Sequence, residues 1–239
     1  MTRPLRASFL AVLVLLGAVP AARAQSVASL FTNLPADFAH LFTPANGIIV
    51  GVGGAGSAAI HPKDDEIAPK IAAASGGRHD FFRAGATLGD GVEQSGFALG
   101  MYIIGRASHS ERVGALGADL VDAQIVNGVL TQGLKAAVDR RRPTGSKHSF
   151  PSGHSSATFA TAAVIEQHYG WKVAAPFYAL GGYVSLSRMV DNQHWASDVI
   201  FGAAVGIVSG RAASFRHGQR ISVSPSVLPG GFAIVGAVR

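Results

Sequence analysis

The residues best suited to chemistry are basic and histidine side chains that form three clusters between residues 135 and 198. The first is Lys135 followed by Arg142-Pro143, the second is Pro151-Ser152-Gly153-His154, and the third is Ser187-Arg188 followed by His194 and Asp198. Lysine and arginine bind phosphate, and histidine can act as a nucleophile, acid or base near neutral pH. The three clusters together therefore indicate a site that binds and transforms a phosphate ester.

Lys135 and Arg142 are seven residues apart, which is nearly two turns of a helix. We therefore expect both side chains to leave one helix face and to bind the same anion. Arg142 would form paired hydrogen bonds, and Lys135 would act as a point charge. A solvated basic helix end is the alternative, and we favour that alternative for Arg140 and Arg141.

The second cluster has the composition of a helix start. Pro151 and Ser152 suit the first turn and the cap, and Gly153 lets a ligand approach the backbone. The free N–H groups and the positive dipole end of such a helix attract anions, and His154 would stand beside the bound group. Taken alone, this cluster is better explained as a capped helix with an incidental surface histidine.

His194 and Asp198 have the spacing of neighbours on one helix face. A carboxylate on one ring nitrogen fixes the tautomer and raises the basicity of the other nitrogen, which would make His194 a nucleophile. Arg188 lies upstream and could reach the same anion. A helical surface pair is the alternative, but the apolar flanks at 195–196 and 199–201 predict partial burial.

These motifs resemble the type 2 phosphatidic acid phosphatase superfamily, which shares its fold and site with bacterial class A acid phosphatases and vanadium-dependent haloperoxidases. The family pattern is Lys-x6-Arg-Pro, Pro-Ser-Gly-His and Ser-Arg-x5-His-x3-Asp, and the chain matches every position. The resemblance implies that His194 attacks phosphorus and forms a phosphohistidine, that Asp198 orients His194, and that His154 protonates the leaving group. It also implies that no metal or other cofactor is needed, and that the phosphate is bound by Lys135, Arg142, Ser152, Gly153 and Arg188.

The pattern of apolar residues predicts a mostly α-helical bundle. The resemblance implies that this bundle is of the acid phosphatase and haloperoxidase type. We expect helices over 64–74, 80–106, 113–138, 152–169, 173–188 and 196–211, the glycines interrupting the second of these. Residues 47–215 would form the phosphatase domain, after an irregular lead-in at 25–46 with a short helix around 35–42. The glycine-rich stretch at 47–60 is expected to be a loop or a helix contact. Residues 216–239 would form a β-leaning, extended tail.

Residues 1–24 have the features of a secretory signal peptide, with basic Arg3 and Arg6, an apolar run and a cleavage site near Ala24. The apolar stretches of the remaining chain are shorter than the ~20 residues that a spanning helix needs. We therefore expect a soluble periplasmic or secreted protein, with weak contact at a membrane surface as an open alternative. The chain has no cysteine, which excludes thiol chemistry and cysteine-ligated zinc.

Removing the signal peptide removes three arginines and no acidic residue, so the formal charge falls from +6 to +3. This mild charge does not indicate a nucleic-acid partner, and the sequence shows no nucleic-acid-binding motif. The expected partner is a small-molecule or lipid phosphate substrate. The oligomeric state cannot be read from the sequence.

The leading hypothesis is an exported phosphatase, a phosphoric ester hydrolase acting on phosphate monoesters, lipid phosphates or isoprenyl diphosphates. A vanadium-dependent haloperoxidase with bound vanadate is the alternative enzyme, because vanadate and phosphate need the same binding residues. Haloperoxidases tend to be longer chains, which favours the phosphatase. A non-catalytic envelope protein of the same fold is a third hypothesis, against which the complete set of His154, His194 and Asp198 argues.

Overall fold

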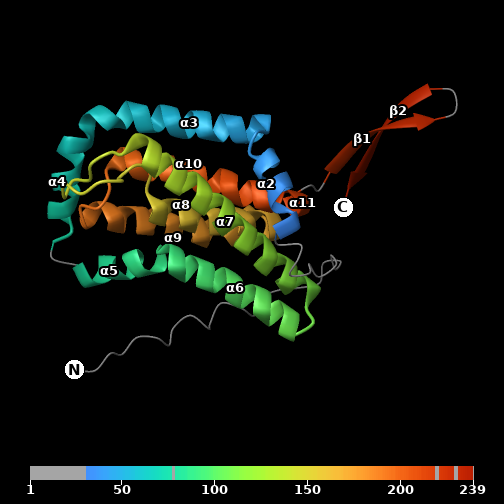
Figure 1. Ribbon diagram of the computed structural model, residues 1–239, viewed down its shortest axis with the longest axis horizontal. Helices are drawn as coiled ribbons and strands as arrows, with labels where there is room; N and C mark the ends of the chain where they lie inside the picture. The colour runs from blue at the N-terminus through green and yellow to red at the C-terminus, as the bar shows by residue number, and fades with distance from the viewer. Residues whose placement is uncertain (1–30, 77–78, 219–220, 229–230, 239) are drawn as a thin grey trace.

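The computed structural model describes residues 31–76, 79–218, 221–228 and 231–238, and its helices lie side by side in an elongated bundle (Figure 1). The helical elements are α2 (Leu34–His40), α3 (Pro44–Ile60), the 3-10 turn η1 (His61–Lys63), α4 (Asp64–Ala74), α5 (His79–Leu88), α6 (Gly91–Ala107), α7 (Glu111–Val138), α8 (Gly153–Tyr169), α9 (Trp171–Val190), α10 (Ala196–Ala213) and α11 (Phe215–Gly218). The predicted mostly helical fold is confirmed. The helix expected over 80–106 is divided into α5 and α6, because Asp90 caps a new helix start with a 2.9 Å bond from the amide of Val92.

Helices α8 and α10 approach each other closely because the facing side chains are small. A Cβ on Gly206 would lie 2.2 Å from the carbonyl oxygen of Ser156, and one on Gly210 would lie 2.4 Å from that of Ala160. Small residues four apart allow this kind of backbone contact between long apolar helices. The contact fixes the N-terminus of α8 beside that of α10, where the second and third motifs begin.

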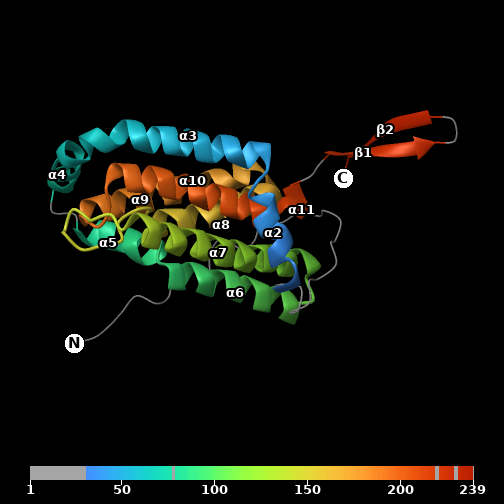
Figure 2. The ribbon, with the colours of Figure 1, turned by 45° about the horizontal axis from the view of Figure 1, so that its top comes forward.

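The remaining helices cover this pair in layers. Figure 2 shows α3 lying over α10, with α6 along α7 on the opposite side of the bundle. The glycine-rich stretch predicted as a loop or a helix contact is a helix contact, since a Cβ on Gly53 of α3 would lie 2.3 Å from Cβ of Ala204. Gly117 of α7 meets the backbone of Tyr102 in α6 just as closely.

The expectation of a soluble periplasmic or secreted protein is wrong. By length and composition, α7 (28 residues) and α10 (18 residues) can each cross a membrane, and α2 with Pro44–Ala74 would add a third span if this pair, bent by 63°, is counted as one. The sequence analysis predicted this helix but did not recognise it as a possible membrane span, because Asp119, Asp122 and Lys135 interrupt its apolar run. These side chains are at most 9 % exposed, so they face the bundle and not the lipid.

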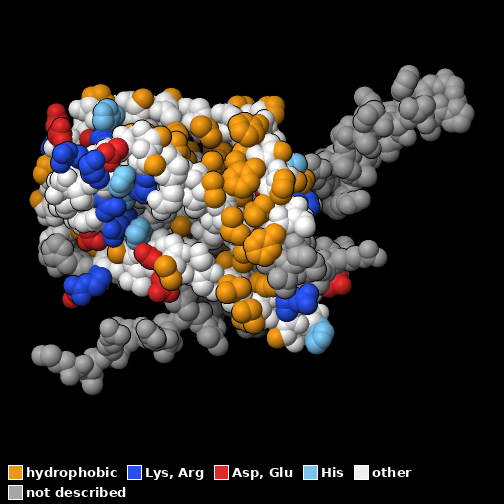
Figure 3. All heavy atoms as spheres, viewed as in Figure 1, with side chains coloured by type: hydrophobic (Ala, Val, Ile, Leu, Met, Phe, Trp, Pro, Cys, Tyr) orange, Lys and Arg blue, Asp and Glu red, His pale blue; other side chains and the backbone are white. Residues whose placement is uncertain are grey.

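Apolar side chains lie on the outside of the bundle. On the face shown in Figure 3, they form a band between charged groups at the two ends. Helix α3 exposes Ile48 and Val52, each at 68 %, and α6 exposes Leu99 and Ile103 at 50 % and 55 %. Such a band is what a helical protein presents to the hydrocarbon of a bilayer.

The C-terminal residues form two antiparallel strands, β1 (Ile221–Leu228) and β2 (Gly231–Val238), paired from Ile221 with Val238 to Leu228 with Gly231. This agrees with the predicted β-leaning tail. The predicted signal peptide at 1–24 lies outside the described residues.

Candidate active site

Four helix ends meet at the α4 end of the bundle, and they carry the three motifs. Lys135 lies in the last turn of α7, His154 in the first turn of α8, Arg188 in the last turn of α9, and Asp198 in the first turn of α10. His194 lies in the short loop between α9 and α10. Residues spread over 64 positions of the sequence are thereby brought to one end of the molecule, as predicted.

The start of α8 has an open first turn beside a lysine side chain. Ser152 caps the helix by accepting a hydrogen bond from the amide of Ser155 at 3.4 Å, and its own amide donates to the carbonyl of Asp198 at 3.0 Å. A Cβ added to Gly153 would meet only Thr131 and Cε of Lys135, at 3.7 and 3.9 Å, so this turn lies directly beside the lysine. The open backbone, the helix dipole and the ammonium group all favour negative charge there.

Two arginines face the same region with donors still free. Arg142 donates through Nη1 to Oε1 of Gln193 at 2.6 Å, and Arg188 donates through Nη1 to Oδ2 of Asp191 at 3.2 Å. The Nε atoms of both are buried and have no hydrogen-bond partner within the described part of the chain. Buried guanidinium donors without partners are expected where an anion binds.

The prediction that Lys135 and Arg142 share one helix face is wrong, although both reach the site. Helix α7 ends at Val138, because Asp139 adopts a left-handed conformation with φ 43° and ψ 38°. Arg142 therefore approaches from the loop between α7 and α8. Lys135 donates to the carbonyl oxygen of His148 at 2.7 Å. The His148 ring is 53 % exposed, so this residue serves the site through its backbone.

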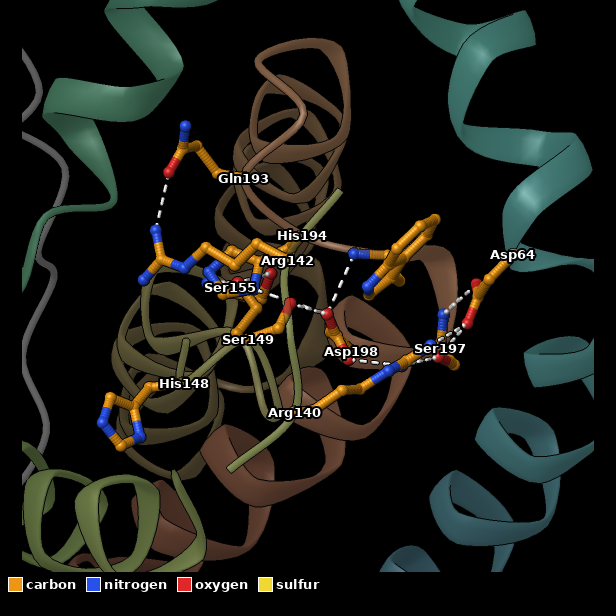
Figure 4. Close-up of polar contacts among 12 residues, drawn as sticks. Asp64, Arg140, Arg142, His148, Ser149, Ser155, Gln193, His194, Ser197 and Asp198 are labelled. Atoms are coloured by element: carbon orange, nitrogen blue, oxygen red, sulfur yellow. Dashed lines mark hydrogen bonds and ion pairs between the residues drawn. The ribbon is translucent and has the colours of Figure 1, made fainter. Parts of the chain in front are cut away.

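His194 and Asp198 are neighbours, but not through a helix, since α10 begins only at Ala196. Nδ1 of His194 lies 3.6 Å from Oδ2 of Asp198, and Nδ1 has no hydrogen-bond partner within the described residues. This distance is longer than a hydrogen bond and lies within ion-pair range once the ring carries positive charge. The carboxylate itself is fully buried and accepts hydrogen bonds from Ser149, Trp195 and Arg140 (Figure 4).

The two histidine rings share one electrostatic environment. Burial lowers the pKa of His154 to about 4, assisted by the positive charge of Arg188 and by His194 itself. Burial also lowers the pKa of His194 to about 4, with contributions from Lys135 and Arg142 that Asp198 opposes. These shifts favour the neutral form of both rings at pH 7, and a bound anion would favour their protonated forms.

Several residues at the site are not specified by any of the three sequence motifs. Asp90 places Oδ2 3.6 Å from Nε2 of His154, and Gln193 holds Arg142. Arg140, expected on a solvated helix end, is turned inward after Asp139 and forms ion pairs with Asp198 and Asp64 at 2.7 and 2.8 Å. No local pattern could have indicated Asp64 or Asp90, because their partners lie far away in the sequence.

A separate cavity of about 430 Å³ lies between α4, α5 and α9, with Phe81, Leu186 and Val190 among its lining residues. Leu186 and Val190 are one helical turn apart, and Arg188 projects to the opposite side of α9. This cavity therefore faces away from the catalytic residues.

Comparison with known proteins gives a family match for part of the chain. Residues 144–221, which include the second and third motifs, match the sequence model of the PAP2 superfamily. The chain carries a PAP2 superfamily region. The resemblance expected from the three motifs is therefore confirmed, although the first motif lies outside the matched residues.

Individual relatives agree with this assignment. A lipid A 1-phosphatase of Porphyromonas gingivalis is 40 % identical over 98 residues, covering 38 % of this chain and 21 % of the relative. A lipid A 1-phosphatase of Rhizobium etli is 33 % identical over 110 residues, covering 38 % and 46 %. The chain thus spans less than half the length of these curated relatives. The crystal structure of Aquifex aeolicus LpxE is similar in fold, with a TM-score of 0.53 at 24 % identity, over 63 % of this chain and 93 % of that one.

Proposed function

We propose that the PAP2 region of this chain is a phosphatase that hydrolyses the phosphate monoester of a membrane lipid. The observation that carries the proposal is the meeting of buried His194 and partly buried His154 with Lys135, Arg142 and Arg188 where four helices end or begin. Cations and helix dipoles fixed around one point favour the charge of a transferring phosphoryl group.

In the first step, His194 would attack phosphorus through Nε2, because Nδ1 faces Asp198 at 3.6 Å. The new N–P bond forms as the P–O bond to the lipid breaks, and His154 gives its proton to the departing alkoxide. The phosphate dianion raises the proton affinity of His154 on binding, so that the ring can carry this proton. Asp198 stabilises the positive charge that His194 acquires.

In the second step, a water molecule attacks the phosphohistidine. His154, now neutral, takes a proton from this water, the N–P bond breaks, and inorganic phosphate leaves. Lys135, Arg142, Arg188 and the Gly153 amide would hold the non-bridging oxygens through both steps. We propose that these cations supply the charge that a metal ion supplies in other phosphatases, so that activity survives chelators.

The lipid class of the substrate is supported by the membrane-spanning length of α7 and α10 and by the exposed apolar helices. The catalytic groups lie at one end of the bundle, beyond its apolar band, where a phosphate headgroup would meet them. The names of the two lipid A 1-phosphatases point in the same direction.

The test is release of inorganic phosphate by the purified full chain in detergent, with EDTA present, from lipid A, phosphatidic acid, an isoprenyl diphosphate and p-nitrophenyl phosphate. We expect a lipid phosphate to be the best substrate and His194→Ala to be inactive. Halide oxidation with vanadate and peroxide, in the absence of phosphatase activity, would instead identify a haloperoxidase. No activity in either assay would support a non-catalytic protein.

A further inference from the structure

Behind Asp198, a second set of charged residues extends from the active site to the start of α4. Arg140 donates through Nη1 to Oδ1 of Asp198 at 2.7 Å and through Nη2 to Oδ2 of Asp64 at 2.8 Å. Figure 4 shows the guanidinium between the two carboxylates, on the side of Asp198 away from His194. Neither Arg140 nor Asp64 belongs to one of the three motifs.

The charged side chains of this second set are largely buried. The side chains of Asp198, Asp64 and Arg140 are 0 %, 3 % and 18 % exposed. Burying such charges costs several kcal/mol per ion, which is recovered only when the geometry is good and further hydrogen bonds satisfy the remaining atoms. Hydrophobic residues could join α4 to α10 at lower cost, so the ionic arrangement indicates a need to fix one of these groups in position.

The group that is fixed is the Asp198 carboxylate. Oδ1 is held by Arg140, while Oδ2 accepts hydrogen bonds from the Ser149 hydroxyl at 2.5 Å and the Trp195 amide at 2.9 Å. With Oδ1 held from behind, Oδ2 is kept toward His194. Without Arg140, the carboxylate would keep its hydrogen bonds at Oδ2 and lose the one at Oδ1. It could then rotate more widely about its last torsion, because such terminal torsions are broad.

Asp64 holds the same region through the backbone. Its Oδ1 accepts from the Ser197 amide at 3.1 Å, and its Oδ2 accepts from the Ser197 hydroxyl at 2.5 Å. The Ser197 hydroxyl also receives a hydrogen bond from Arg140 at 2.6 Å. A carboxylate from α4 thus binds the first turn of α10, where a negative charge is favoured. The residue that follows in this turn is Asp198.

We propose that Arg140 and Asp64 are positioning residues for catalysis, which hold the Asp198 carboxylate against His194. This inference rests on the proposed phosphatase function. Arg140 acts on Asp198 directly, and Asp64 acts through Arg140 and Ser197. A change at either residue misaligns the nucleophile and leaves the phosphate-binding cations in place. The expected effect is therefore on kcat rather than on KM.

The test compares Arg140→Gln, Arg140→Lys and Asp64→Asn with wild type, using kcat and KM for the best lipid phosphate. Arg141→Gln is the matched control, because Arg141 is exposed and its side chain donates to the carbonyl of Gly145 at 3.3 Å. We expect kcat to fall about 100-fold in Arg140→Gln and about 10-fold in Asp64→Asn, with KM within about two-fold. Arg140→Lys keeps the charge and should recover at least part of the loss.

The double variant Arg140→Gln/Asp64→Asn should lose less kcat than the product of the two single losses, because Asp64 acts partly through Arg140. Additive losses, or equal kcat in Arg140→Gln and Arg141→Gln, would overturn the inference. If Arg140→Gln does not fold, the test rests on Asp64→Asn and Arg140→Lys. An unchanged kcat in both of these variants would overturn the inference. Wild-type activity that His194→Ala abolishes shows that the proposed function holds whichever way these variants behave.

Discussion

Nδ1 of His194 lies 3.6 Å from Oδ2 of Asp198, and that carboxylate is held from the other side by Arg140 at 2.7 Å. The pair is arranged to stabilise positive charge on the ring, which is present only after attack on phosphorus. We therefore expect Asp198→Asn to lower kcat by about 100- to 1000-fold with KM nearly unchanged. Steady-state kinetics with a lipid phosphate measures this, and a change in KM alone would show that Asp198 acts only in binding.

His154→Gln should discriminate between substrates by their leaving groups. A lipid alkoxide needs a proton as it departs, so we expect kcat to fall about 1000-fold with a lipid phosphate. The p-nitrophenolate ion leaves without a proton, so we expect the phosphorylation step, measured as the burst of p-nitrophenolate, to slow only about 10-fold with p-nitrophenyl phosphate. Equal losses with both substrates would contradict the role of His154 as the general acid.

The stability of the protein should depend on pH through the same histidines. Burial lowers the pKa of His154 and of His194 to about 4, below the ordinary histidine value of 6.5. The unfolded chain then binds more protons than the folded chain between these values, so stability is lost as pH falls from about 6.5 toward 4. Above about pH 7 the contribution is fully present.

Thermal unfolding in detergent, measured between pH 4 and 7, tests this. The decline of Tm toward low pH should be smaller in His154→Gln than in wild type, by an amount equivalent to about 1–3 kcal/mol. Parallel curves for the two proteins would mean that His154 is not held neutral in the folded state.

Packing between α8 and α10 should tolerate no added side chain. Gly210→Ala places a Cβ 2.4 Å from the carbonyl of Ala160, and we expect destabilisation by about 1–3 kcal/mol. Gly182→Ala is the control, because a Cβ there meets nothing within 4 Å, and alanine favours the helix. Tm should fall in the first variant and be unchanged or higher in the second; the same Tm in both would contradict the close helix contact.

The sequence was informative where a local rule applies. Apolar spacing and glycine or proline breaks located most helices, and the helix start predicted at Ser152 and Gly153 is observed. Prediction from the sequence was wrong where the backbone conformation of a single residue determines where a helix ends. The left-handed Asp139 ends α7 and turns Arg140 inward, and no composition rule distinguishes this from a solvated helix end.

Two further features depend on contacts between distant residues. Asp64 and Ser197 are 133 positions apart, so their contact becomes visible only in the folded chain. The membrane-spanning length of α7 was concealed because Asp119 and Asp122 interrupt its apolar run, and only the fold shows that they face inward at 0 % exposure. The roles of the site residues stay predictions until variants are measured.

The most direct measurement is capture of the covalent intermediate. The purified chain is mixed with a ³²P-labelled lipid phosphate, quenched within milliseconds, and analysed for label that is stable to base and labile to acid, as a phosphohistidine is. We predict that label maps to His194, is absent in His194→Ala, and accumulates in His154→Gln when p-nitrophenyl phosphate is the ³²P donor. Hydrolysis by wild type with no labelled protein at any quench time, or label on another residue, would contradict the account.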